Sequence, residues 1–224
     1  MNTIESLIQA EELAIQLFDE IEKIGLIKAG KTENQLNSEI FELAKQLFGI
    51  EKYWHKRIVR AGKNTIFPYR ENPPDLLIAD EDILFLDFGP IFEEWEADLG
   101  RTYVLGENKD YLKMKADVET TWNEGYEYYK KHRNELIAAD FYHFCCQTAK
   151  KIGWKFGHIH CGHLIGKFPH ERIQGEETLN YIHPDNKSAM SEPDKMGNER
   201  FWIYEIHLVD KNESFGGFYE QLLR

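Results

Sequence analysis

Apolar residues recur at helical spacing in four segments of the chain. Over residues 4–24 they return at every third or fourth position, which predicts an amphipathic helix. A second helix is predicted to begin after Thr32, with Gln35 three positions on to complete a capping box, and to end at Gly49. Two further helices are predicted at residues 111–132 and 135–152.

Two other segments have the pattern of β-hairpins. Residues 82–105 read as DILFLDFG and ADLGRTYVLG around an acidic connection. Near the end of the chain, FWIYEIHLV and FGGFYEQLL flank a polar turn at Asp210–Glu213. Two polar, proline-containing segments are predicted to be loops, at Pro68–Pro74 and at Pro184–Asn198. Antiparallel hairpins combined with helices predict an α+β fold.

Composition narrows the class of protein. The 224 residues suit one domain, and 42% hydrophobic residues suffice for a sizeable core. The formal net charge is -12, with 39 acidic and 27 basic residues and no basic run, which argues against binding to nucleic acid or to an anionic membrane surface. No apolar run approaches the roughly 20 residues that span a bilayer.

The location is expected to be cytoplasmic. The opening MNTIESLIQA lacks the basic start and apolar stretch of a signal peptide. The three cysteines include the adjacent pair Cys145 and Cys146, and their number is odd, so a disulfide framework is not expected. A reducing compartment fits this pattern.

Carboxylates inside apolar strands carry the first chemical signal. Asp87 stands near the end of DILFLDFG, where a carboxylate is costly unless it is paired, hydrogen-bonded or bound to a metal ion. Asp98 follows eleven residues on, at the start of the return strand, so one hairpin could place both on the same face. Taken alone, this hairpin favours the ordinary alternative, in which both residues flank a turn and pair with Arg101.

The second hairpin repeats this arrangement and favours a metal site over the turn-flanking alternative. Period-two alternation places Glu205 on one strand face with Ile203, His207 and Val209. Glu220 follows fifteen residues later, so a turn near residue 212 brings the two glutamates close to opposition. The chain therefore has two hairpins that each offer two inward carboxylates.

A histidine-rich stretch, CGHLIGKFPHE, lies between the hairpins. Gly162 and Gly166 flank His163, and His170 follows seven residues after it. One imidazole beside four carboxylates forms a mostly hard ligand set, which suits a pair of divalent Mn, Fe, Co or Zn ions sharing bridging carboxylates. The predicted metal ligands are Asp87, Asp98, His163, Glu205 and Glu220.

These segments resemble the methionine aminopeptidase, aminopeptidase P, prolidase and creatinase family of "pita-bread" metallopeptidases. The stretch from Cys161 to Glu171 is similar to the family pattern CGHGIG…HE, and LDFG…ADLGRTYVLG is similar to D-x-G…D-x-x-R-T-x-x-x-G. GLIKAGKTENQL resembles the family's opening helices. The five ligands also occur in the family's order.

The resemblance implies a pita-bread fold, in which a pseudo-twofold antiparallel sheet is covered by helices. It implies a single catalytic domain over residues 1–224, without the N-terminal domain of prolidases. The opening helices would occupy about 4–48, and the metal site would be built from 82–220. A homodimer is also favoured.

The resemblance further implies a reaction and roles for individual residues. The reaction would be hydrolysis of an amide bond near the N-terminus of a small peptide, with a metal-bridging water as the nucleophile. Glu205 would be both ligand and proton shuttle, and His170 would contact the substrate or the tetrahedral intermediate. Tyr69, His160 and His170 are the predicted substrate-binding residues.

The sequence departs from the family pattern at three places. Tyr69 stands where the family has a substrate-binding histidine, and tyrosine does not titrate near neutrality. Leu164 replaces a glycine and is expected to narrow the pocket. Arg172–Ile173 stand where the family often has a proline.

These departures leave alternatives to an aminopeptidase or Xaa-Pro dipeptidase. One is a lyase or amidohydrolase that acts on a non-peptide small molecule with the same fold. Another is a metal-binding scaffold protein without catalysis, which the complete ligand set disfavours. In each enzymatic reading the partner is a small molecule or peptide, with neither nucleic acid nor membrane involved.

Overall fold

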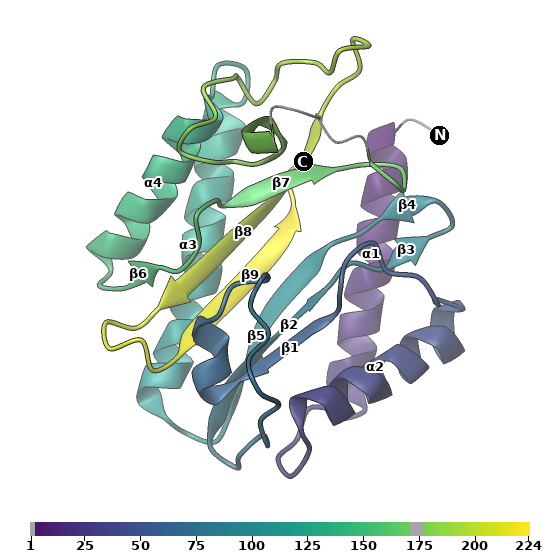
Figure 1. The fold of residues 1–224 in the computed structure, drawn as a ribbon, viewed down its shortest axis with the longest axis vertical. Coiled ribbons are helices and arrows are strands. Elements are labelled where there is room, and N and C mark those ends of the chain that lie inside the picture. Colours follow the sequence, from purple (N-terminus) through teal and green to yellow (C-terminus); the bar gives the residue numbers. More distant parts are fainter. Residues whose placement is uncertain (1–2, 171–176) are drawn as a thin grey trace.

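The computed structural model describes residues 3–170 and 177–224 (Figure 1). Two helices open the chain, α1 (Thr3–Lys23) and α2 (Glu33–Phe48). The Thr32 side chain accepts a hydrogen bond from the Gln35 amide while Gln35 bonds back, and Gly49 ends α2 at φ 68°. The predicted capping box and glycine cap are therefore confirmed.

An antiparallel sheet of seven strands forms the centre of the described chain. Its order is β1-β2-β5-β9-β8-β6, and β7 pairs with the start of β8, whereas β6 pairs with its end (Figure 1). A separate two-stranded ribbon joins β3 to β4. The strands are β1 (Ile58–Ala61), β2 (Asp82–Phe88), β3 (Ile91–Phe92), β4 (Trp95–Glu96), β5 (Leu99–Leu105), β6 (Lys155–Phe156), β7 (Gly162–Ile165), β8 (Phe201–Val209) and β9 (Gly216–Leu222).

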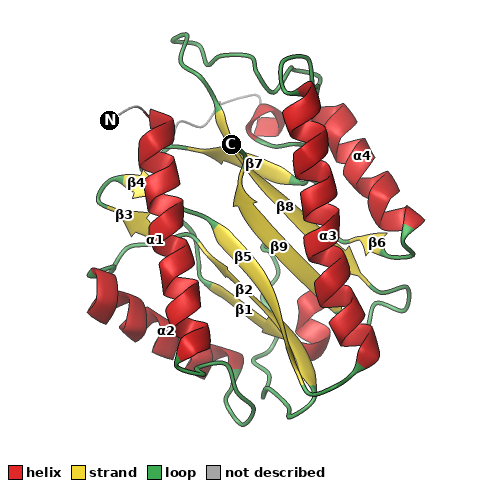
Figure 2. Ribbon diagram, turned by 180° about the vertical axis from the view of Figure 1, so that it is seen from behind, coloured by secondary structure: helices red, strands yellow, loops and turns green. Residues whose placement is uncertain are grey.

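Helices cover one face of this sheet. Figure 2 shows α1 and α3 (Lys109–His132) lying across the same face, α1 over the half containing β5 and α3 over the half containing β8 and β9, with α4 (Ala138–Lys151) outside α3. Two apolar clusters fill the layer between helices and sheet, one mainly beneath α1 and α2 and the other beneath α3 and α4. Two short 3-10 turns complete the elements, at Gly62–Ile66 and Glu177–Asn180.

Strand alternation decides which side chains reach the uncovered face. On β8, Tyr204 and Ile206 belong to the apolar cluster under α3 and α4. Because successive side chains alternate across a strand, Glu205 and His207 point to the opposite face. The sheet therefore separates an apolar layer from a polar, concave side.

The predicted helices and hairpins are confirmed, with small changes at their ends. The fourth helix begins at Ala138 rather than at residue 135, because the Ala138 and Ala139 amides donate to Ser188 and Asn186 carbonyls of a neighbouring loop. Strands β1, β3, β4, β6 and β7 were not predicted, since two to four residues carry little periodic signal. Glu171, Arg172 and Ile173 lie outside the described residues.

Among the helices of the described residues, none combines the length and the apolarity needed to cross a bilayer.

Gly125 provides a test of the packing between α3 and the sheet. A Cβ atom at this position would lie 1.8 Å from the Tyr204 hydroxyl oxygen, which is buried. We expect Gly125→Ala to lower the free energy of unfolding by about 1–3 kcal/mol, the usual cost of overpacking a core, although alanine favours helices. Urea denaturation measures this change.

The matched control is Asn123→Ala, two residues away on the exposed side of α3. It should leave stability unchanged or raise it by about 0.5 kcal/mol, since only helix propensity changes. Equal stability of the two variants would contradict the close contact between Gly125 and Tyr204.

Candidate metal centre

A row of three carboxylates crosses the middle of the sheet. Asp87 on β2 is paired in register with Gly100 on β5, Gly100 with Glu220 on β9, and Glu220 with Glu205 on β8. Strand pairing thus fixes the row before any side-chain contact is considered. All three carboxylates are buried.

Gly100 leaves the space that this row needs. A Cβ atom there would lie 2.5 Å from the Phe218 ring and 2.9 Å from Cβ of Glu220. Any larger residue would therefore displace Glu220 or the aromatic side chain next to it. Asp98, two residues before Gly100, supplies the fourth carboxylate.

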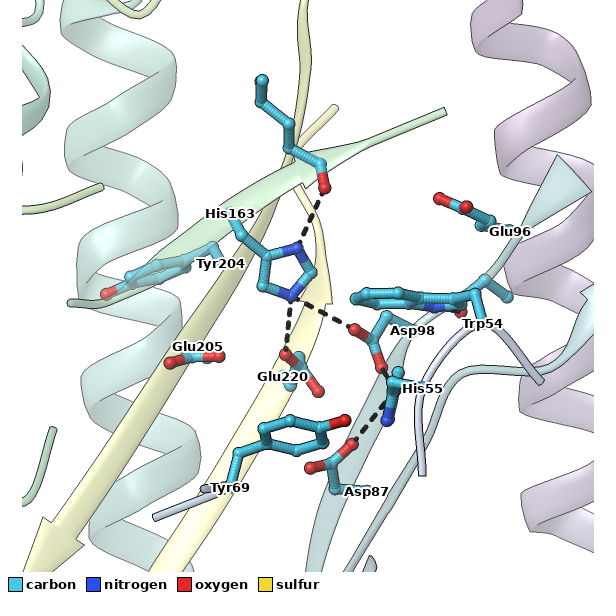
Figure 3. Close-up of polar contacts among 12 residues, drawn as sticks. Trp54, His55, Tyr69, Asp87, Glu96, Asp98, His163, Tyr204, Glu205 and Glu220 are labelled. Atoms are coloured by element: carbon cyan, nitrogen blue, oxygen red, sulfur yellow. Dashed lines mark hydrogen bonds and ion pairs between the residues drawn. The ribbon is translucent and has the colours of Figure 1, made fainter. Parts of the chain in front are cut away.

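Asp98 lies between two histidines, one on each side (Figure 3). Its Oδ1 atom is 3.0 Å from His55 Nε2, and its Oδ2 atom is 3.2 Å from His163 Nε2. His163 Nε2 also lies 3.6 Å from Glu220 Oε1, and His55 Nε2 lies 3.5 Å from Asp87 Oδ1. Asp98 is therefore shared between two groups of donor atoms.

A backbone hydrogen bond orients the His163 ring. Its Nδ1 atom lies 3.0 Å from the carbonyl oxygen of Leu164, so the Nδ1–H donates. In the neutral ring this leaves the lone pair on Nε2, the atom that faces Asp98 and Glu220. Such outer contacts commonly fix the tautomer of metal-binding histidines.

Glu205 has two imidazoles of its own. His158 Nδ1 is 3.1 Å and His160 Nδ1 is 3.0 Å from the same oxygen, Oε1. The two rings also contact each other at a centroid distance of 3.9 Å. His158 therefore lies in the site beside His160.

A cavity of about 560 Å³ opens on this face of the sheet. Every residue that the sequence analysis singled out for metal binding, catalysis or substrate binding lines it. These residues are Tyr69, Asp87, Asp98, His160, His163, His170, Glu205 and Glu220.

The four carboxylates differ in electrostatic environment. Burial, together with the nearby charge of Asp98, raises the pKa of Asp87 to about 7 despite the opposing effect of His55. Burial and the charges of Asp98 and Asp87 raise the pKa of Glu220 well above its usual range. Burial also disfavours the ionised form of Asp98, but the charges and hydrogen bonds of His55 and His163 outweigh it and lower that pKa.

The histidines show the complementary effects. Burial alone would lower the pKa of His55, but the charges of Asp98 and Asp87 raise it to about 9. Burial lowers the pKa of His160 to about 4 even though Glu205 opposes this. In Glu205, the contacts with His160 and His158 overcome burial and hold the pKa well below its usual range.

This donor set fits divalent cations. Three groups of donor atoms lie close enough to share an ion: His55 with Asp87 and Asp98, Asp98 with His163 and Glu220, and Glu205 with His158 and His160. Glu220 Oε2 is buried and has no hydrogen-bond partner within the described part of the chain. Buried carboxylates that repel one another are stabilised by a bound cation.

His170 is held at the rim of the site by Glu96, which is buried on β4. His170 Nδ1 lies 2.7 Å from Glu96 Oε2, and the His170 backbone amide donates to Oε1 at 3.2 Å. The carboxylate accepts the Nδ1–H, so Nε2 remains as the ring nitrogen available to the cavity. Trp54 contacts the His170 ring edge to face at 5.4 Å.

Tyr69 lies beside His55 and Asp87 in the site (Figure 3). Its ring meets the His55 ring edge to face at 5.6 Å, and its hydroxyl accepts a hydrogen bond from the Lys56 amide at 3.3 Å. The Lys56 ammonium also lies over the Tyr69 ring. The side chain is thus held against the segment that precedes β1.

Two expectations from the sequence are wrong. Arg101 does not pair with Asp87 or Asp98: its guanidinium donates to the carbonyl oxygens of Gly100 and Glu220 and to Gln221, and stacks on Tyr219 across the sheet. Leu164 does not narrow the pocket. It alternates with His163 on β7 and packs into the apolar cluster behind the sheet.

Sequence reasoning missed three residues of the site: Trp54, His55 and Glu96. His55 precedes Asp87 by 32 positions in the sequence. The two meet because β1 pairs with β2, with Ile58 opposite Asp87. A prediction of the short strand β1 from the sequence would have indicated that His55 lies near Asp87.

Comparisons with known proteins agree with this geometry. The profile of metallopeptidase family M24 matches residues 5–201. No curated protein matches the chain in sequence. Among solved structures, a dipeptidase from Pyrococcus horikoshii OT3 is 24% identical, with a TM-score of 0.76 over 97% of this chain and 55% of that one.

Two further structures show how the fold is shared. An X-Pro aminopeptidase from Thermotoga maritima is 22% identical, with a TM-score of 0.73 over 97% of this chain and 56% of that one. A methionine aminopeptidase from Rickettsia prowazekii is 15% identical, with a TM-score of 0.69 over 99% of this chain and 94% of that one. The chain thus spans a little over half the length of the first two proteins and nearly all of the third.

The likeness to these structures shows the α+β pita-bread fold that the sequence motifs predicted. The match of the family profile extends over most of the chain and includes three of the five residues predicted to bind metal. Asp87, Asp98 and His163 fall inside residues 5–201, and Glu205 and Glu220 follow this range on β8 and β9. The chain belongs to metallopeptidase family M24.

Proposed function

We propose that the chain is a dinuclear metal-dependent peptidase that hydrolyses an amide bond near the N-terminus of small peptides. The observation that carries this proposal is the convergence of Asp87, Asp98, His163, Glu205 and Glu220 on one cavity. Two divalent ions, of Mn, Co, Fe or Zn, would neutralise the buried carboxylates. Residues 1–224 would form one catalytic domain, with opening helices at about 4–48 and the metal site within 82–220.

The bound ions would supply Lewis acidity, which lowers the pKa of a water molecule and polarises a carbonyl group. The side chains of the protein would hold the ions in place and accept or donate protons during the reaction. Both imidazoles next to Glu205 face Oε1, so Oε2 is the oxygen left for an ion or a proton. The proposed roles of Glu205 as ligand and proton shuttle are consistent with this arrangement.

His170 is proposed to stabilise the negative charge that develops on the substrate during hydrolysis. Its Nδ1–H is committed to Glu96, so Nε2 can carry a proton toward an oxyanion in the cavity. Burial of Glu96 keeps this contact away from solvent. Glu96 would thus act through His170 as a positioning residue.

The size and walls of the cavity favour a small peptide. A volume of about 560 Å³ lies within the range of roughly 300–1,000 Å³ that is typical of small-ligand sites. Tyr69 and Arg70 are exposed residues of its lining, and His160 lines it beside Glu205. Tyr69 and His160 are the proposed contacts to the substrate, together with His170.

One observation supports a second candidate. Tyr69, in place of the family's histidine, is held by Lys56 and packed on His55. A phenol in this position provides a different hydrogen-bonding group from an imidazole. A non-peptide amide or a lyase substrate would be the alternative for this site.

Metal binding should release protons. Asp87 has a pKa of about 7 and Glu220 one that is raised well above its usual range, and both must be ionised to hold a cation. Affinity for Zn²⁺ should therefore rise as the pH increases from about 6 to 8, as protons compete less. Calorimetric titration in two buffers of different ionisation enthalpy measures the protons released.

The Glu220→Gln variant is the control for this titration, because the glutamine amide does not lose a proton when a metal ion binds. It should bind more weakly and release fewer protons than the wild type. Identical heats in the two buffers for the wild type would contradict the proposed ligands.

A peptide panel tests the activity. Met-Xaa, Xaa-Pro and Xaa-Pro-Xaa peptides would be incubated with the protein after addition of Mn, Co, Fe or Zn. We expect cleavage of at least one class with metal present, and its loss in Asp98→Asn, which removes the carboxylate shared by both histidines. Metal-loaded wild-type protein that cleaves no peptide would reject the peptidase and favour the non-peptide alternative.

The His170–Glu96 pair gives a sharper test of mechanism. We expect His170→Ala to lower turnover by about 10²-fold with metal content retained, the usual scale for an acid–base or electrostatic group. As a single substitution, Glu96→Ala should lower turnover. Combined with His170→Ala it should have little further effect, since Glu96 acts through His170. Unchanged turnover in His170→Ala would remove His170 from the mechanism.

A further inference from the structure

His55 lies at the centre of the site, in the segment that leads into β1. The Trp54 backbone amide donates to the Gly89 carbonyl at 3.0 Å, and Tyr53 bridges to Pro90. These contacts hold the segment against the end of β2, beside Asp87. We propose that His55 is a ligand of the metal centre, with Nε2 joining Asp87 and Asp98 around one ion; this rests on the proposed metal pair.

The donor atom is presented by a fixed ring. His55 Nδ1 lies 2.7 Å from the Lys56 carbonyl oxygen, which can only accept, so Nδ1 carries the hydrogen. A neutral ring then directs the Nε2 lone pair at Asp98 Oδ1 and Asp87 Oδ1, at 3.0 and 3.5 Å. Three electron-rich atoms facing one point are stabilised by a cation between them.

His163 provides a matching arrangement on the other side of Asp98. Its Nδ1–H donates to a backbone carbonyl, and its Nε2 faces Asp98 Oδ2 and Glu220 Oε1. The Nε2 atoms of the two histidines thus face the two oxygens of the Asp98 carboxylate in the same way. Each ion of the pair would receive one imidazole.

The space for His55 is built into the strand end. A Cβ atom at Gly89 would lie 2.3 Å from His55 Cδ2 and 2.4 Å from Trp54 Nε1. The Trp54 ring packs on the His55 ring edge to face at 4.4 Å and is itself anchored by Nε1–H donation to the Ala97 carbonyl at 3.0 Å. The imidazole is therefore held in its orientation by neighbours on two sides.

An extra imidazole changes which ions the site prefers. Carboxylates suit Mn²⁺ well, whereas imidazole favours Zn²⁺, Co²⁺ and Ni²⁺. The ion held by Asp87 and Asp98 should therefore be of the second kind.

Co²⁺-substituted protein gives a direct test without any peptide. In its proton NMR spectrum, each ligating imidazole contributes one strongly shifted N–H signal that disappears in D₂O. With two equivalents of Co²⁺, the wild type should show such signals from the Nδ1–H groups of His55 and His163. His55→Phe should lose one of them, and His163→Phe should lose the other.

The variants are chosen so that a folding defect does not decide the result. His55→Gln, which keeps a polar side chain, should lose the same signal as His55→Phe, and circular dichroism checks the fold of both. His143→Phe is the matched control, because it makes the same substitution at an exposed histidine of α4 that does not line the cavity. It should keep both signals.

Calorimetry adds an independent measure. His55→Phe should weaken binding of one Zn²⁺ equivalent by at least about 10-fold, the lower end of what loss of an outer-shell partner alone costs, and should weaken Mn²⁺ binding less. Unchanged N–H signals and Zn²⁺ affinity in both His55 variants would overturn the proposal. A wild type that binds one ion, with a His55→Phe variant that binds two, would also overturn the proposal. The His55 side chain would then occupy the position of an ion.

These outcomes are separate from those of the peptide panel. Peptide cleavage with unchanged Co²⁺ spectra in the His55 variants would reject the ligand and leave the peptidase in place. Loss of the His55 signal in a protein that cleaves no peptide would support the ligand and reject the peptidase.

Discussion

The structure depends on placing like-charged carboxylates opposite one another in the middle of a sheet. Glu205 and Glu220 are direct partners across β8 and β9, a pairing that is unfavourable for two negative charges. Asp87 extends the same row through Gly100, where the missing side chain leaves room. A bound cation would stabilise this buried row, which lies on the face of the sheet that carries the cavity and the histidines.

The apolar half of the molecule makes that row rigid. The side chains on either side of Glu205 along β8, Tyr204 and Ile206, point into the layer under α3 and α4. There Tyr204 meets Gly125, and its carbonyl oxygen accepts a hydrogen bond from the Trp122 indole N–H. Alternation therefore serves two purposes on one strand. One set of side chains anchors the strand, and the other presents ligands to the cavity.

Sequence pattern located most of the site because four of the five proposed ligands belong to two hairpins with long strands. Glu205 and Glu220 were found from period-two alternation and a turn position, and the structure confirms that they pair across β8 and β9. Asp87 and Asp98 were found as carboxylates of the first hairpin, in which Asp87 pairs with Gly100 and Asp98 lies just before β5. His55 could not be found in this way, since its contact depends on a four-residue strand paired far along the chain.

The central claim is that this cavity holds a pair of divalent ions. Elemental analysis of protein supplied with Co²⁺ or Zn²⁺ and then freed of unbound metal tests it most directly. The account predicts two ions retained per chain. Protein that retains no metal under these conditions would contradict it, because the buried carboxylates would then have to be stabilised by protons and histidines alone.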